Sequence, residues 1–152
     1  MSHPEPATPV IRRTGTAGLV VQMTLGSALA GFVAALLGAS VAGSTINLTA
    51  GILIRGVLAL LLLLLIGGIL GRRAKQSGVS RPILVLGVGA LLGFLLDPLT
   101  WQARTLLTQL VTEPGMLTVI GDLGLWMLTA LAGVRLGTSG AVPPPPTDTP
   151  YG

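Results

Sequence analysis

The chain contains no cysteine, and its one histidine, His3, lies close to the N-terminus. The lack of cysteine excludes disulfides, zinc–thiolate sites, iron–sulfur clusters and thiol catalysis. A serine nucleophile needs a nearby base, and no apolar segment of the chain supplies a histidine. We therefore expect a protein that is not an enzyme, with no catalytic residues, no metal site and no cofactor.

Charge is also scarce. Asp, Glu, Lys and Arg make up 9% of the 152 residues, compared with about 25% in soluble domains. Hydrophobic residues make up 51%, and the mean hydropathy is +0.83. A compact monomer of this size could not carry so little charge and stay dissolved in water. The composition therefore predicts an integral membrane protein whose main partner is the lipid bilayer.

Aromatic residues account for only 3% of the chain, although the formal net charge is +4. Proteins that bind nucleic acids combine a basic surface with aromatic side chains on which bases stack. The shortage of aromatics argues against a nucleic-acid partner. The positive charge is better explained by orientation in a membrane, because basic residues flank the apolar segments.

Four apolar segments approach or exceed the length of about 20 residues that a helix needs to cross a bilayer. They cover about residues 17–42, 48–71, 81–97 and 115–136. We predict an all-α membrane protein in which residues 17–137 form a four-transmembrane-helix bundle. Residues 1–16 are expected to form a flexible N-terminal tail, and residues 138–152 a Pro-rich C-terminal tail.

The stretch 98–112, between the third and fourth segments, predicts an amphipathic helix that lies in the membrane interface. Asp97 followed by Pro98 suits the N-cap and first position of such a helix. Its apolar residues fall within one broad arc, and Trp101 suits the interface. The alternative is that this stretch continues the third segment as one long, kinked helix.

Basic residues are unevenly distributed between the connections. If four segments cross the membrane, one side carries Arg12, Arg13, Arg72, Arg73, Lys75, Arg81 and Arg135. The other side carries Arg104, together with Arg55 if that side chain extends outward. Because basic residues gather on the cytoplasmic side, we predict a multi-pass protein of the cell membrane with both termini in the cytoplasm.

Small residues recur four positions apart in the apolar segments, a spacing that allows two helix backbones to approach closely. We expect this packing role for Gly31, Gly38, Gly67, Gly71, Gly89, Gly93 and Gly133. The contacts can lie within one chain or, through the first segment, between copies in a homo-oligomer. The alternative is that glycine is simply common in membrane helices.

Three ionisable residues, Arg55, Asp97 and Asp122, lie within or at the edge of the apolar segments. Counting residues at 1.5 Å each places Arg55 and Asp97 at nearly the same height, and all three in the outer third of the membrane. We therefore predict a buried polar cluster. It could be a structural ion pair, an arginine that extends to the interface beside a capping aspartate, or a site for an ion, a proton or a small substrate.

The predicted spans contain few polar residues, and this favours a non-enzymatic accessory or scaffold subunit within a homo-oligomer or a larger membrane complex. The alternative is an oligomeric small transporter or channel that uses the Arg55, Asp97 and Asp122 cluster. A weaker alternative is a phage-type hole-forming protein, which would also be small, apolar and oligomeric.

Overall fold

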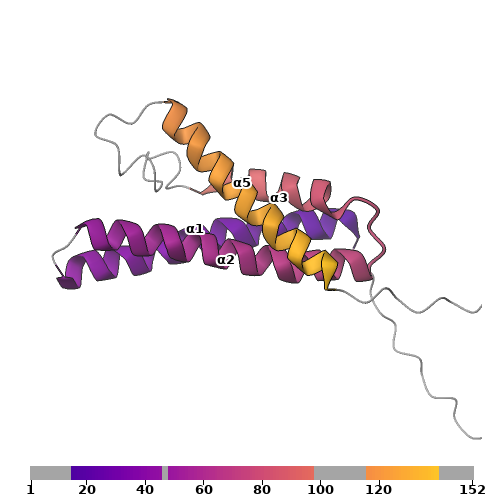
Figure 1. Ribbon diagram of the computed structural model, residues 1–152, viewed down its shortest axis with the longest axis horizontal. Helices are drawn as coiled ribbons and strands as arrows, with labels where there is room; N and C mark the ends of the chain where they lie inside the picture. The colour runs from indigo at the N-terminus through magenta and orange to yellow at the C-terminus, as the bar shows by residue number, and fades with distance from the viewer. Residues whose placement is uncertain (1–14, 46–47, 98–115, 141–152) are drawn as a thin grey trace, which may run out of the picture.

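The computed structural model describes residues 15–45, 48–97 and 116–140, and these ranges are built from helices (Figure 1). The helices are α1 (Thr16–Thr45), α2 (Leu48–Gln76), α3 (Pro82–Leu96) and α5 (Met116–Ser139). The described part of the chain is therefore all-helical, as the sequence predicts. The amphipathic helix expected over 98–112 and the two predicted tails, apart from their residues nearest the bundle, lie outside the described residues.

Three of these helices are long and apolar enough to cross a membrane, namely α1, α2 and α5, with 30, 29 and 24 residues. The fourth, α3, has only 15 residues. Its length of about 22 Å is less than the ~30 Å hydrocarbon core of a bilayer. Prolines limit it at both ends: Pro82 opens the helix, and a proline at position 98 disfavours helical geometry at Asp97, which adopts φ −67° and ψ 111°.

The four helices form two antiparallel pairs, α1–α2 and α3–α5, that pack side by side (Figure 1). Residue numbers run in opposite directions across the α1–α2 contact and rise together across the α1–α3 and α2–α5 contacts, so α3 is parallel to α1 and α5 is parallel to α2. The contacts that set these directions are Gly26–Ile66 and Gly38–Arg55, Gly89–Met23 and Gly93–Ser27, and Gly67–Ala130 and Gly71–Val134.

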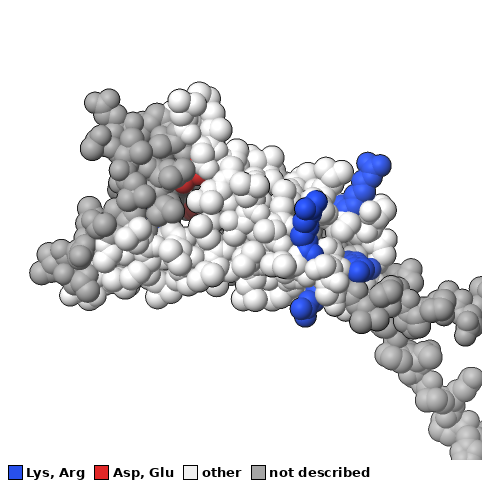
Figure 2. All heavy atoms as spheres, viewed as in Figure 1, with Lys and Arg blue, Asp and Glu red and all other residues white. Residues whose placement is uncertain are grey.

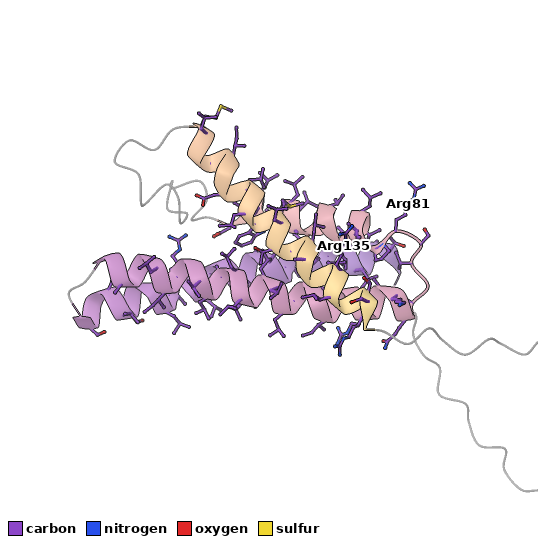
Figure 3. All side chains as sticks on the ribbon, viewed as in Figure 1. Arg81 and Arg135 are labelled. Atoms are coloured by element: carbon purple, nitrogen blue, oxygen red, sulfur yellow. The ribbon has the colours of Figure 1, made fainter. Side chains whose placement is uncertain are left out.

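The start of α1, the turn between α2 and α3, and the end of α5 lie at one end of the bundle (Figure 1). We call this the basic end, because it carries Arg72, Arg73, Lys75, Arg81 and Arg135. Figure 2 shows basic side chains gathered there, and Figure 3 labels Arg81 at the start of α3 and Arg135 near the end of α5. The sequence placed Arg72, Arg73 and Lys75 in a loop, but they belong to the last turns of α2.

The turn that follows α2 ends the helix with a glycine in the left-handed conformation. Gly78 has φ +71°, and its N–H donates to the carbonyl of Lys75 at 3.0 Å. The N–H of Val79 donates back to the carbonyl of Ala74, also at 3.0 Å. This pair of bonds is the Schellman motif, which satisfies carbonyl groups left without a helical partner. The turn reverses the chain in a few residues and brings Arg81 to the basic end.

The outside of the bundle is apolar, and its seams are filled by small residues. Long side chains such as Leu25, Leu61 and Leu128 are exposed. In the seams, the seven glycines expected to pack all face a neighbouring segment of the bundle. A Cβ atom added at any of them would come within 3.0 Å of an atom of a neighbouring helix or, at Gly31, of Asp97, the residue that follows α3. Large apolar side chains outside and backbone contact inside are the pattern of helices surrounded by lipid.

Candidate functional site

Asp97 is the last described residue of the α3 segment, and its side chain is buried, with 3% of its surface exposed. The carboxylate lies against α1 at Gly31, where a Cβ atom would come within 2.7 Å of Oδ2. The backbone N–H of Asp97 donates to the carbonyl of Gly93 at 3.0 Å and closes the helix. The absence of a side chain at Gly31 therefore makes room for a charged group in the interior of the bundle.

Asp122 lies on α5 and is also buried, with 6% of its surface exposed. It precedes Trp126 by one helical turn, so the two residues share a face of α5. Trp126 reaches across the bundle. Its Nε1–H donates to the carbonyl of Ala90 at 3.2 Å, and its ring packs edge-on against Phe94, with centroids 5.7 Å apart.

The indole of Trp126 also lies beside Gly31, since a Cβ atom there would meet its Cη2 at 3.4 Å. Gly31 therefore contacts the carboxylate of Asp97 on α3 and the ring of Trp126 on α5. This is the point at which α1, α3 and α5 converge. No role is expected for Trp126 from composition or hydropathy, and its spacing of four residues from Asp122 is the feature of the sequence that indicates one.

Two buried hydroxyl groups line the α1–α3 seam next to Asp97. Ser27 donates to the carbonyl of Met23 at 2.7 Å, and Thr24 donates to the carbonyl of Val20 at 2.9 Å. Ser27 also fills the space opposite Gly93, where any side chain would collide with its Oγ. Such bonds to the preceding helical turn satisfy a hydroxyl without help from another helix, so these two residues keep the seam narrow.

Arg55, on α2, lies opposite a later part of α1 than Asp97 does. Its Cβ packs against Gly38, seven residues beyond Gly31, and this corresponds to about 10 Å along the helix. The sequence analysis expected Arg55 and Asp97 at nearly the same height. The difference arises because residues 77–81 form the turn and add no helical length on the α3 side.

The register between α1 and α2 gives the distances of Asp97 and Arg55 from the basic end. Because Gly26 lies against Ile66, the level of Asp97 is about 16 Å from the level of Arg72, whereas Arg55 is about 25 Å from it. The level of Asp97 is therefore about half the thickness of a ~30 Å core away from Arg72, whereas the sequence predicts a position in the outer third. Figure 2 shows the acidic side chains set back into the surface, away from the basic end.

The described residues hold no group of three or more His, Cys, Asp or Glu side chains that could bind a metal ion. The site thus contains two buried carboxylates, the Trp126 indole and two α1 hydroxyls, and the Cβ atom of Arg55 lies about two helical turns from the level of Gly31. Comparison of the chain with protein-family models, with curated proteins and with solved structures finds no match.

Proposed function

We propose that this protein is a non-enzymatic accessory or scaffold subunit of the cell membrane that acts by presenting helix surfaces to other membrane components. The observation that carries the proposal is the contrast between outside and inside. Leu128 is 70% exposed and Leu136 is 62% exposed on α5, whereas Ala130 and Val134 on the same helix are fully buried. Only hydrocarbon, or another membrane protein, can cover such an exterior without a large free-energy cost.

The proposal includes a fourth span and an orientation. α3 starts at the same end as α1 and packs against α1 and α5, which supports its placement within the same hydrocarbon layer. The basic end supports a cytoplasmic location for the α2–α3 turn and for both ends of the bundle domain, because basic residues are enriched on that side. Four spans with this orientation remain our interpretation of the bundle.

An apolar layer separates the buried carboxylates from the basic end. Leu70, Leu86 and Val134 are at most 5% exposed and lie in that half of the bundle. The polar buried residues of the described chain are Thr24, Ser27, Asp97 and Asp122. A continuous polar path across the membrane is therefore not supported by the described interior, and this favours the scaffold role over transport.

Site-specific photo-crosslinking in the native membrane tests the scaffold role. A photoreactive residue in place of Leu128 should crosslink to one defined membrane protein. The same residue in place of Leu63, which is fully buried, should give no intermolecular product. Removal of the gene should then lower the abundance of the crosslinked protein. If Leu128 crosslinks to lipid alone and no other protein depends on the chain, the scaffold role is wrong.

The second candidate is an oligomeric small transporter or channel, and the burial of two carboxylates, Asp97 and Asp122, inside the bundle is the observation that favours it. Charged groups inside a membrane are costly and mark ion or proton pathways. Proton and cation flux in liposomes should be compared for the wild type, Asp97→Asn, Asp122→Asn and Arg55→Gln. Flux that disappears in either asparagine variant, with unfolding in detergent unchanged, would favour transport. If the asparagine variants unfold more easily in detergent and no sample shows flux, the carboxylates have a structural role.

A further inference from the structure

A shallow apolar groove with a volume of about 480 Å³ follows the outer seam between α2 and α5. Leu61, Leu65, Gly68 and Arg72 line it from α2, and Leu136 and Gly137 line it from α5. These four, out of six α2 residues that line the groove, are spaced by four, three and four positions and therefore follow one face of that helix. The groove therefore runs along α2 and ends at the arginine.

Two glycines produce the groove. A Cβ atom at Gly137 would collide with the carbonyl oxygen of Gly68, so α2 and α5 meet there backbone to backbone. The leucines on both sides project outward, and Leu65 is 59% exposed. The glycines consequently form a recessed floor between apolar walls of leucine, and the groove is open toward the outside of the bundle.

The dimensions and charge of the groove match one leaflet of a bilayer. From Leu61 to Arg72 the groove extends about 16 Å, close to half of a ~30 Å hydrocarbon core. Its polar end is at the basic end, where the described chain has no acidic residue, because Asp97 and Asp122 lie deeper in the bundle. A guanidinium group can bind a phosphate through two parallel hydrogen bonds.

We propose that this groove binds one anionic phospholipid, with an acyl chain along Leu61, Leu65 and Gly68 and the phosphate at Arg72. The inference rests on the proposed membrane location. Basic recesses between membrane helices on the cytoplasmic side bind anionic headgroups. A second copy of the chain is a poorer occupant, because a symmetric parallel contact through this face would bring the two Arg72 side chains together.

Native mass spectrometry of the full chain tests the assignment of the headgroup. Detergent-purified protein is supplied with equal amounts of phosphatidylglycerol and phosphatidylcholine that carry the same acyl chains. The wild type should retain phosphatidylglycerol preferentially, and Arg72→Gln should lower that retention about fivefold, as expected for one basic residue near a charged lipid surface. Arg81→Gln removes the same charge at the same end, outside the groove, and should leave retention unchanged.

A second pair of variants tests the groove itself. Leu65→Trp fills the groove and should abolish the retained lipid, whereas Leu25→Trp places the same ring on an exposed position of α1 and should not. Equal losses in Arg72→Gln and Arg81→Gln would overturn the proposal, because they would indicate general charge attraction. A wild-type dimer that Leu65→Trp dissociates would overturn it in favour of a second copy. Failure of the membrane location would appear separately, as release of the wild type from membranes by alkaline carbonate.

Discussion

At the residue scale, Trp126 and a few glycines determine how closely the helices approach. The indole joins α5 to α3 through a hydrogen bond to Ala90 and reaches α1 at Gly31. The glycines allow backbone to meet backbone, so dispersion contacts become dense along the seams. Substitutions at these positions should therefore affect the free energy of unfolding more than substitutions of exposed leucines.

Replacement of Trp126 by phenylalanine separates the hydrogen bond from the packing of the ring. The variant keeps an aromatic ring beside Phe94 but loses the donor to the Ala90 carbonyl. We expect a loss of about 0.5–1.5 kcal/mol in the free energy of unfolding, measured by SDS titration in detergent micelles. Leu128→Ala, at an exposed position of the same helix, should change it by less than about 0.5 kcal/mol. Equal losses in the two variants would contradict the role given to the indole N–H.

Two glycines of α5 provide a matched test of backbone packing. A Cβ atom at Gly133 would collide with the carbonyl oxygen of Leu64, whereas one at Gly124 would meet nothing within 4 Å. Gly133→Ala should therefore destabilise the bundle by about 1–3 kcal/mol. Gly124→Ala should be neutral or stabilise it by up to about 1 kcal/mol through helix propensity. The same titration measures both, and a neutral Gly133→Ala would show that α2 and α5 are farther apart than described.

At the element scale, the turn after α2 and the short α3 decide the level of the buried charges. The Schellman motif places Gly78 two residues after Gln76, the last residue of α2, and α3 starts at Pro82 and ends before Asp97. The cation of Lys75 donates to the carbonyl of Thr138 at the end of α5, at 2.7 Å, where the helix dipole favours positive charge. The basic end is therefore held by local backbone geometry and by a hydrogen bond between α2 and α5.

The positive φ of Gly78 makes this turn sensitive to a side chain. Gly78→Ala should cost about 1–2 kcal/mol, because an L-residue is strained in the left-handed region, and Gly78→Asn should cost less, because asparagine tolerates that region. Gly43→Ala is the control, since Gly43 is exposed on α1 with open space around it and has no positive φ. Thermal unfolding in detergent measures the three variants. An alanine variant as stable as the wild type would mean that the turn adopts another geometry.

At the scale of the whole molecule, the two antiparallel helix pairs lie side by side. This arrangement places Arg72, Arg73, Lys75, Arg81 and Arg135 at the basic end. The opposite end holds the end of α1, the start of α2 and the start of α5, and its described charges are the carboxylates within the bundle and Arg55 near Gly38. An uneven distribution of basic residues of this kind sets the orientation of a membrane protein, because basic residues stay on the cytoplasmic side.

The lack of cysteine allows a direct test of that orientation. Single cysteines in place of Ser80 and Gly140, both exposed at the basic end, should react with a membrane-impermeant maleimide only after the membrane is opened. A cysteine in place of Ser44, exposed at the other end, should react in intact cells. Labelling of Ser80→Cys and Ser44→Cys from the same side would contradict a membrane-spanning α1 and α2.

The sequence by itself determined the all-helical class, the helix ranges to within a few residues and the gathering of basic residues, because hydropathy, proline and charge act locally along the chain. It also identified the glycines that belong to series of small residues four positions apart. Only the tertiary structure decided which helices those glycines meet, that Trp126 bridges three helices, and that Asp97 lies about two turns from the level of Arg55. These features depend on the register between helices. Side-chain and backbone packing sets that register, and counting residues through a turn does not reproduce it.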